Sequence, residues 1–342
     1  MEFHKATLYG KRDLRIEKEL FERELAPDEI LIRTEVSALS TGTDLGNYLG
    51  DSTYVPGAPQ YPRWVGYSNV GVVAEIGSAV RSVRAGDRIF TAKPHRSAFL
   101  ATERDMMVPV PDGLASEEAS LAYLTNLGLA ALQQARYQTG ENVVVTGLGV
   151  IGLCTIALAR AMGSKVVGVA NSEVRARAAR EVGADDCLMS GSPEVLPGVR
   201  KCFRGNEADI VVATSNAWDS YFESLELARF GGRIAVLGFP GRGQPVPDRN
   251  PLSPHPFYEK QLTLVGCGYS PAVECPPQDL RFNRRRNLEY ILDLMASQRM
   301  KVAPLITHRY PYQRMREAYE LACGHSKEMI AAVFDWRTLA EL

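Results

Sequence analysis

The sequence predicts an α/β protein in which a β-rich domain is joined to a doubly wound parallel sheet. From residue 141 onward, strand-like and helix-like segments alternate, a pattern that is typical of a parallel sheet with helices on both faces. Before about residue 115 the chain instead carries short strand patterns separated by glycine and proline, which favours an irregular antiparallel sheet. A length of 342 residues is enough for two such domains.

The first part of the chain is expected to form strands over residues 30–36, 69–76, 87–90 and 107–109. Ser116, Glu117 and Glu118 then resemble the first turn of a helix, where acidic side chains are favourable. Residues 119–135 are apolar on all sides, as in a buried helix. We expect this helix to connect the two domains.

The most informative stretch is a glycine turn between a strand at 143–146 and a helix at 151–162. The strand is β-branched and apolar without alternation, as a strand covered on both faces should be, and another apolar strand follows at 165–169. In this setting Gly147 permits a tight turn, Gly149 lets a pyrophosphate approach the backbone, and Gly152 lets the helix pack closely. The pattern predicts a dinucleotide site whose backbone ligands are Gly147, Leu148, Gly149, Val150, Ile151 and Gly152. The alternative is a strand-to-helix turn that binds no ligand.

Further strands are expected at 208–213, 233–237 and 262–266, with helices at 173–182 and 218–229. Residues 190–205 have the composition of a loop, and the proline-rich residues 239–256 predict an excursion without regular structure. Helices at 281–297 and 312–322 are expected to return to the first domain.

Composition excludes several classes of function. A formal net charge of −1 gives no reason to expect nucleic acid, and no apolar stretch is long enough to span a membrane. The start of the chain has no apolar signal segment, so we expect a soluble cytoplasmic protein. The six cysteines show no paired spacing, which argues against a disulfide framework, and all of them follow residue 153.

Several landmarks occur together and in order along the chain. They are Gly86-Asp87-Arg88-Ile89, the helix at 121–131, the glycine turn, Gly183-Ala184-Asp185, Gly231-Gly232-Arg233 and Ile306-Thr307-His308-Arg309. Together they resemble the medium-chain dehydrogenase/reductase superfamily. The resemblance implies a GroES-like catalytic domain built from residues 1–120 and 268–342, with a Rossmann domain at 121–267 inserted between them. It also implies hydride transfer between a nicotinamide cofactor and a small-molecule substrate in the cleft, and a homodimer.

Zinc alcohol dehydrogenases of this superfamily hold their metal with a Cys-His-Cys site, and the matching positions are here Thr41, Tyr67 and, less securely, Leu121. A hydroxyl, a phenol and an isobutyl group do not supply the donors that Zn²⁺ needs, so we expect no metal. Their four-cysteine structural lobe is missing as well, because residues 91–105 contain no cysteine. The segment from Ser40 to Asp44 resembles a zinc-free subgroup that includes bacteriochlorophyllide dehydrogenase-like proteins.

Without a metal, a side chain must donate a hydrogen bond to the oxyanion that forms during reduction. Tyr67, at the position of the histidine ligand, is the leading candidate, and the alternative is that it only fills the vacated space. Thr43 matches the family's proton-relay residue, whereas the histidine that ends the relay in many members is replaced by Gly46. Thr41 completes the expected catalytic set, and Asp44, Tyr48 and His95 are weaker candidates.

The expected cofactor is NADPH rather than NADH. NAD-preferring sites place an acidic residue after the second strand to bind the ribose 2′-hydroxyl, but Asn171 and Ser172 stand there, followed by Arg175. These residues can offer hydrogen bonds and charge to a 2′-phosphate. Glu173 remains an alternative ligand for the ribose. Further cofactor contacts are expected from Thr125, with Asn126 beside it, and from Thr214, Leu237, Gly238, Gly266 and Cys267.

The favoured activity is a zinc-independent interconversion of a ketone and a secondary alcohol. Reduction of an activated C=C bond, as in an enone or a quinone, is the close alternative, and a non-catalytic NADPH-binding protein is an alternative of another class. The loops around residues 45–64, 94–99 and 268–285 are expected to line the substrate pocket.

Overall fold

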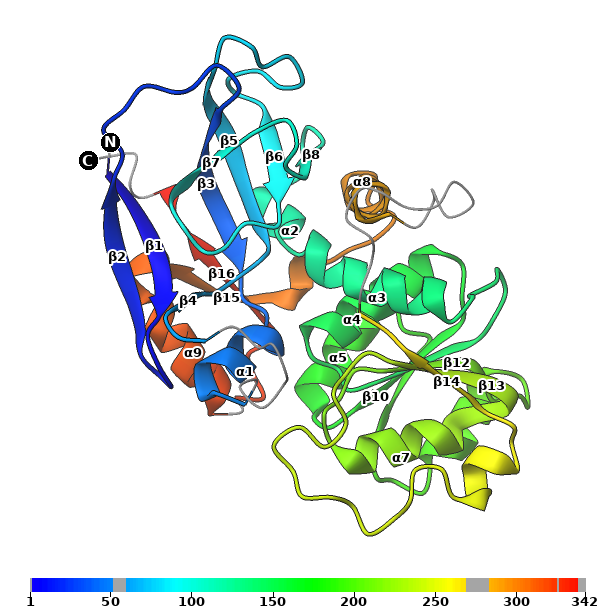
Figure 1. The fold of residues 1–342 in the computed structure, drawn as a ribbon. Coiled ribbons are helices and arrows are strands. Elements are labelled where there is room, and N and C mark those ends of the chain that lie inside the picture. The colour runs from blue at the N-terminus through cyan, green and yellow to red at the C-terminus, as the bar shows by residue number, and fades with distance from the viewer. Residues whose placement is uncertain (1, 52–59, 269–282, 325, 338–342) are drawn as a thin grey trace.

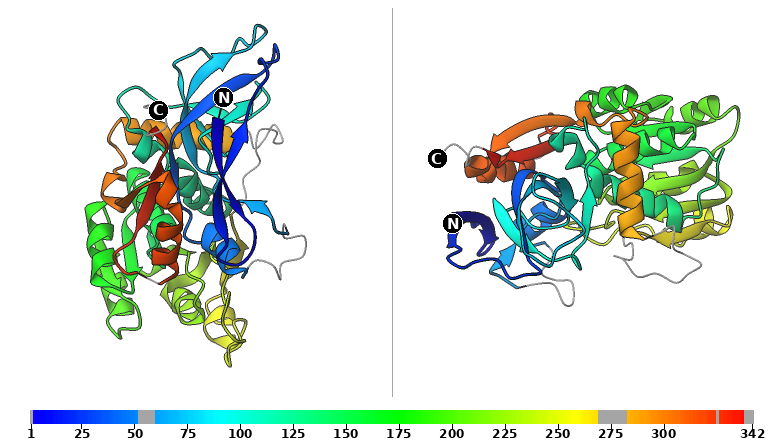
Figure 2. Two further views of the ribbon diagram at one scale, coloured as in Figure 1. Left: turned by 90° about the vertical axis from the view of Figure 1, so that its left-hand side faces the viewer. Right: turned by 90° about the horizontal axis from the view of Figure 1, so that it is seen from above.

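The protein is described by a computed structural model that covers residues 2–51, 60–268, 283–324 and 326–337 (Figure 1). Its strands form two groups, one built from both ends of the chain and one from the middle. Figure 2 shows that the two termini lie on the same domain. The predicted fold class, a GroES-like domain with a Rossmann parallel sheet domain, is confirmed.

The first group contains a three-stranded and a seven-stranded sheet. The small sheet has the order β2-β1-β4, and the larger one has the order β15-β16-β3-β5-β6-β8, with β7 also paired to β3. The strands are β1 (Glu2–Leu8), β2 (Leu14–Leu20), β3 (Ile30–Ala38), β4 (Arg63–Trp64), β5 (Asn69–Ile76), β6 (Arg88–Thr91), β7 (Ala98–Ala101), β8 (Met107–Pro109), β15 (Ile306–Pro311) and β16 (Ala331–Asp335). Because β16 runs antiparallel to β3, with Val333 opposite Ala38, the C-terminal segment completes the sheet that the N-terminal segment begins.

The second group is a six-stranded parallel sheet with the order β11-β10-β9-β12-β13-β14. Its strands are β9 (Val143–Thr146), β10 (Val166–Ala170), β11 (Asp186–Met189), β12 (Ala208–Ala213), β13 (Ala228–Val236) and β14 (Thr263–Gly266). The strand order reverses between β9 and β12, where doubly wound sheets bind their ligands.

Alternate residues of each central strand enter opposite cores, which explains the uninterrupted valine run of β9. Val143 and Val145 pack with one cluster that includes α3 and α4, whereas Val144 packs with another that includes α6 and α7. The helices of this domain are α4 (Val150–Ala161), α5 (Glu173–Glu181), α6 (Val195–Cys202) and α7 (Trp218–Leu227). Both faces of the sheet are therefore covered, as a parallel sheet requires.

The connecting segment is two helices rather than the one predicted over residues 119–135. α2 (Ser116–Ala119) ends at Ser120, and α3 (Ala122–Gln134) begins after Leu121. The Ser120 carbonyl accepts a hydrogen bond from the Ser68 hydroxyl, and the Ser120 hydroxyl donates one to the Glu117 carbonyl. These side-chain hydrogen bonds stabilise the interruption between α2 and α3. The remaining helices are α1 (Thr43–Leu49), α8 (Arg284–Ala296) and α9 (Met315–Cys323).

The prediction of a loop over residues 190–205 is wrong, because α6 lies within it. Pro197 and Gly198 lower the local helix propensity, but Val195, Val199 and Phe203 form a buried stripe at helical spacing. The predicted helix at 218–229 ends at Leu227, and β13 follows directly. The excursion predicted at 239–256 holds no strand, and a π-helical turn, Pro254–Tyr258, begins near its end. None of the helices in the described residues is long and apolar enough to cross a membrane.

Candidate active site

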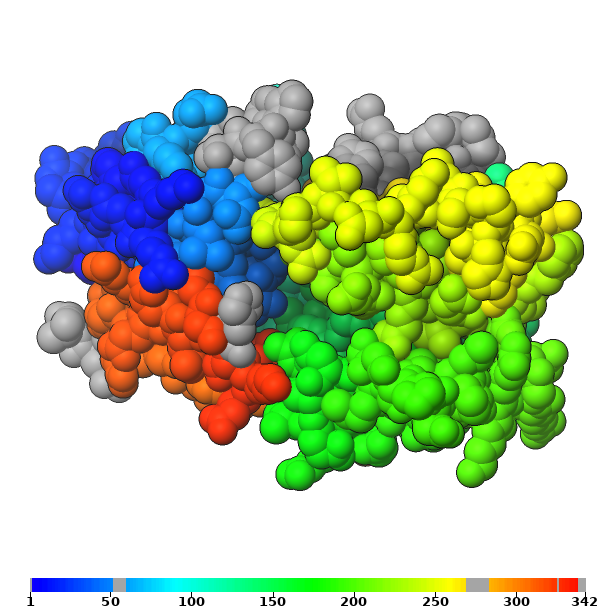
Figure 3. Space-filling model, turned by 90° about the horizontal axis from the view of Figure 1, so that it is seen from below, coloured from blue at the N-terminus to red at the C-terminus, as the bar shows by residue number. Residues whose placement is uncertain are grey.

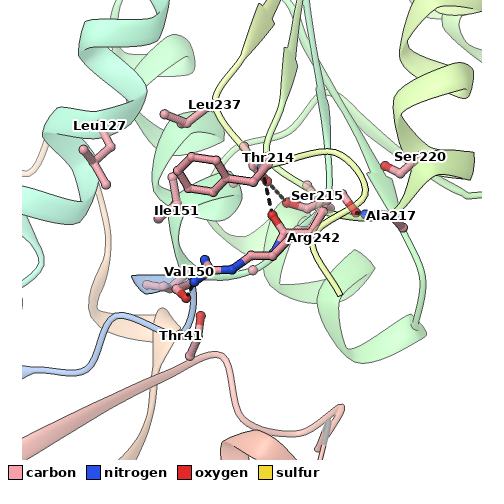
Figure 4. Close-up of a pocket in the computed structure, with 18 of the residues that line it drawn as sticks. Thr41, Leu127, Val150, Ile151, Thr214, Ser215, Ala217, Ser220, Leu237 and Arg242 are labelled. Atoms are coloured by element: carbon pink, nitrogen blue, oxygen red, sulfur yellow. Dashed lines mark hydrogen bonds between the residues drawn. The ribbon is translucent and has the colours of Figure 1, made fainter. Parts of the chain in front are cut away.

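A cavity of about 580 Å³ lies at the carboxyl ends of the parallel strands and reaches the first domain (Figure 4). Of the residues predicted for the site, the following line it: Thr41, Thr43, Gly147, Leu148, Gly149, Val150, Ile151, Gly152, Asn171, Arg175, Thr214, Leu237, Gly238, Gly266 and Cys267. Tyr67, Thr125 and Ser172 are not part of its wall. The structure thus brings most of the predicted positions together around one cavity.

The glycine turn has the shape expected of a phosphate-binding turn. Gly147 has a φ of +80°, which favours glycine, and a Cβ on Gly152 would lie 2.2 Å from the Gly147 carbonyl oxygen. A Cβ on Gly149 would meet nothing within 4 Å, so the turn faces open space. Because Val150 begins α4, the unsatisfied N–H groups of that helix point toward the space that a pyrophosphate would occupy.

The residues after β10 form one end of the cavity. Asn171 and Arg175 line it together with Ser190, which was not predicted. Two buried polar atoms here, the Ser172 Oγ and the Arg175 Nε, have no hydrogen-bond partner, and burial lowers the pKa of Arg175. Glu173, the alternative ribose ligand, lies outside the cavity wall and pairs with Arg180 at 3.5 Å. The Ser172 hydroxyl and the Arg175 guanidinium therefore each hold an unsatisfied polar atom at this end of the cavity.

Of the predicted catalytic residues, Thr41 and Thr43 lie where β3 leads into α1, and Tyr67 lies between β4 and β5. The Tyr67 hydroxyl is hydrogen-bonded to the Ser40 hydroxyl, a partner that was not predicted. Burial and the Asp44 carboxylate raise the pKa of Tyr67, and hydrogen bonds with Ser40 and Thr43 only partly oppose this effect. The phenol therefore keeps its proton at neutral pH. Thr43 lines the cavity, so it connects Tyr67 with the cavity wall.

Asp44 holds these segments in place. Its carboxylate accepts the Ser40 N–H at 3.0 Å and the Gly66 N–H at 2.9 Å, and its side chain is 1% exposed. His95 lies 3.8 Å from the same carboxylate, its Nδ1 bonds the Ser37 hydroxyl, and the side chain is fully buried. Tyr48 is also buried, with its hydroxyl 2.6 Å from Glu320. The three weaker catalytic candidates, Asp44, Tyr48 and His95, therefore do not line the cavity.

The residues at the expected metal position do not fit zinc. Thr41 and Tyr67 are the residues at two of these positions. From α3, Tyr123 packs its ring against the ring of Tyr67, with 5.1 Å between the ring centroids, whereas Leu121 was the residue expected there. Hydroxyls and phenols are poor ligands for this ion. In the part of the chain that the structure describes, no cluster of three or more histidine, cysteine or acidic side chains could hold a metal.

Two predicted contacts from α3 turn away from the cavity. The Thr125 hydroxyl donates to the Leu121 carbonyl at 3.0 Å and is fully buried, and Asn126 bonds Asn287 of α8. Leu127 lines the cavity instead. Helical periodicity could have shown that residues 125 and 127 face different directions.

Other wall residues were missed as well, and most come from loops without a distinctive pattern, whereas Gln134 lies in α3, Val169 in β10, and Asp219 and Ser220 in α7. They are Gly42, Gln134, Val169, Ser215, Asn216, Ala217, Asp219, Ser220, Phe239, Arg242 and Gly268. Residues 215–217 follow the carboxyl end of β12, which lies next to β9 in the sheet, so their position after a predicted central strand could have placed them at the cavity. Of the loops expected to line the substrate pocket, residues 52–59 and 269–282 lie outside the described residues.

Two family models match the chain. The family model of the alcohol dehydrogenase GroES-like domain matches residues 26–116, and that of the zinc-binding dehydrogenases matches residues 150–282. Sorbitol dehydrogenase 1 of Saccharomyces cerevisiae is 26% identical over 336 residues, which cover 85% of this chain and 87% of that protein.

Solved structures share the whole fold. Galactitol-1-phosphate dehydrogenase of Escherichia coli superposes with a TM-score of 0.79 at 18% identity, over 97% of this chain and 99% of the other. For 2R,3R-butanediol dehydrogenase of Bacillus subtilis the TM-score is 0.78 at 19% identity, with coverage of 97% and 99%. These comparisons support the superfamily and its zinc-containing alcohol dehydrogenases, and they do not support the zinc-free subgroup that residues 40–44 resemble. The chain belongs to the medium-chain dehydrogenase/reductase superfamily and is an NAD(P)-dependent medium-chain dehydrogenase.

Proposed function

We propose that this enzyme interconverts a ketone and a secondary alcohol on a small polyhydroxylated substrate, with NADPH and without zinc. The observation that supports the proposal is the hydrogen bond between the Tyr67 and Ser40 hydroxyls, together with the raised pKa that keeps the phenol protonated. The resemblance matches Tyr67 to a metal ligand of the zinc enzymes. The substrate class is suggested by the relatives, which include sorbitol dehydrogenases. The homodimer expected from the resemblance stays a prediction.

The bound nicotinamide supplies the hydride in reduction and accepts it in oxidation. In reduction, Tyr67 donates its phenolic proton to the oxygen of the carbonyl group as negative charge develops there. Ser40 and Thr43 stabilise the resulting phenolate by hydrogen bonds, and a proton from solvent restores the phenol by way of the Thr43 side of the cavity. In oxidation the same groups carry the proton in the opposite direction.

A panel of substrates tests the reaction type. NADPH consumption should depend on ketoses and other hydroxyketones, and enones and quinones should give much lower kcat/KM. A higher kcat/KM for the activated alkenes would show that the enzyme reduces C=C bonds and that the proposed ketone reaction is wrong. Tight NADPH binding without turnover on any compound would indicate a non-catalytic protein.

Zinc dependence can be measured directly. Elemental analysis of the purified protein should find far less than one zinc per chain, and chelators should leave kcat unchanged, because Thr41 and Tyr67 are poor ligands for this ion. Stoichiometric zinc, with activity lost on chelation and restored by zinc alone, would show that the proposal is wrong.

The choice of cofactor is tested by Arg175→Ala. Loss of a charge-assisted hydrogen bond to the 2′-phosphate should weaken NADPH binding by about 10-fold to 100-fold and leave NADH binding unchanged. The matched control is Arg177→Ala, because Arg177 is exposed on the same helix and lies outside the cavity wall. Equal effects of Arg175→Ala on the two cofactors would contradict a 2′-phosphate site.

A further inference from the structure

Arg242 crosses the cleft between the two domains. It belongs to the segment between β13 and β14, yet its Nη1 lies 3.4 Å from the Gly42 carbonyl oxygen at the start of α1. Figure 3 shows this yellow segment lying against the blue part of the first domain. The guanidinium also lies 5.5 Å from the centre of the Phe239 ring. The side chain thus runs from one domain to the other.

The guanidinium reaches this position because glycine stands on the opposite side. A Cβ on Gly46 would lie 1.6 Å from the Arg242 Nη2 and 2.3 Å from its Cζ. Any larger residue at position 46 would therefore occupy the space that the guanidinium now fills. Gly46 is the position where many members of the superfamily have a histidine, so here an arginine from the other domain fills the space above α1.

Arg242 also faces the predicted phosphate site. It lines the same cavity as Gly149 and Val150 of the glycine turn, and Figure 4 shows its side chain running toward Thr41 and Val150. A guanidinium presents several N–H donors in one plane, which suits the oxygens of a phosphate. The N-terminus of α4 attracts an anion from one side of this space, and Arg242 adds a full positive charge from the other.

We propose that Arg242 binds the pyrophosphate of the dinucleotide and, by its contact with Gly42 and Gly46, holds the two domains together around it. The proposal rests on the use of a dinucleotide and is independent of the choice between NADPH and NADH. It assigns Arg242 to the part that the two cofactors share, whereas Arg175 is assigned to the 2′-phosphate that only NADPH carries.

Three probes separate these roles in calorimetric titrations: NADPH, NADH and adenosine 2′-monophosphate, which has no pyrophosphate. Arg242→Ala should raise the Kd of NADPH and of NADH alike, by about tenfold or more, and should leave the Kd of adenosine 2′-monophosphate within about twofold. Arg175→Ala should instead weaken binding of NADPH and of adenosine 2′-monophosphate. Arg249→Ala is the matched control, because Arg249 lies in the same segment but outside this cavity.

Gly46→Ala tests the contact from the other side of the cleft. Alanine suits a helix better than glycine does, so α1 should stay folded, which the circular dichroism spectrum and Tm will show. This change should weaken binding of both cofactors in the natural protein and have no further effect when Arg242 is already alanine.

Unchanged NADH binding in Arg242→Ala, or an effect on NADPH alone, would overturn the proposal. An equal effect of Gly46→Ala with and without Arg242 would also overturn it. If Arg175→Ala changes nothing while Arg242→Ala weakens binding of both cofactors, the preference for NADPH fails and the assignment of Arg242 stands.

Discussion

Tyr67→Phe should lower kcat for ketone reduction by about 10²-fold to 10⁴-fold, the usual contribution of a positioned general acid. The change removes only the hydroxyl that bonds Ser40, and the ring can keep its packing against Tyr123. Cofactor Kd values should stay the same, because Tyr67 is not part of the cavity wall where the dinucleotide is expected. Stopped-flow measurement of NADPH oxidation under single-turnover conditions would isolate the chemical step.

The matched control is Tyr123→Phe, which removes a neighbouring phenol and leaves Tyr67 intact. This variant should keep kcat within a few-fold of the natural protein. If Tyr67→Phe also keeps full turnover, Tyr67 only fills the space of the absent metal ligand, and another group must donate the proton.

The pH profile offers a second test of the same residue. Burial and Asp44 raise the pKa of Tyr67 above its usual value of about 10, so the phenol stays protonated throughout the neutral range. Activity in reduction should therefore show no loss from Tyr67 ionisation between about pH 6 and 9. An inflection in kcat within that range that disappears in Tyr67→Phe would contradict this assignment.

Features that depend on neighbours in the sequence could be predicted from it. The turn from Gly147 to Gly152 is one example, because the strand, the glycines and the helix that form it are contiguous, and Gly147 and Gly152 each answer a local steric demand. The return of the chain to the first domain was predicted from the order of the landmarks. The pairing of β16 with β3 could not be predicted, because the sequence pattern does not determine which residues of the two strands lie opposite each other.

The chemistry of the site depends on distant residues and could be predicted only in part. Tyr67 was proposed from a family position, but its hydrogen-bond partner Ser40 lies 27 positions earlier, and serine is common in loops. Arg242 and Gly42 lie 200 positions apart, and arginine in a proline-rich segment is ordinarily a solvated side chain. The contact between Ser40 and Tyr67 follows from the fold of the first domain, and that between Arg242 and Gly42 from the way the two domains meet. Local sequence patterns encode neither.

Asp44 is the residue whose loss should destabilise the first domain most among the site residues. In Asp44→Ala the buried N–H groups of Ser40 and Gly66 lose the carboxylate that accepts them at 3.0 and 2.9 Å. Each unsatisfied buried donor costs about 1–3 kcal/mol, so the free energy of unfolding should fall by about 2–6 kcal/mol. Urea denaturation followed by tryptophan fluorescence would measure the change, since Trp336 lies in the same domain and is buried.

The same change should also lower activity, because Asp44 fixes the two segments that carry Tyr67 and Ser40, the proposed proton donor and its hydrogen-bond partner. Ser40 follows β3, and Gly66 directly precedes Tyr67, so the carboxylate sets the distance between the Ser40 and Tyr67 hydroxyls. Asp13→Ala is the control, because Asp13 forms an ion pair with Arg15 at the surface, where its loss should leave Tm nearly unchanged. If Asp44→Ala unfolds at the same urea concentration as the natural protein, Asp44 does not hold these segments. If its stability falls while kcat stays the same, the carboxylate supports the fold without positioning the proton donor.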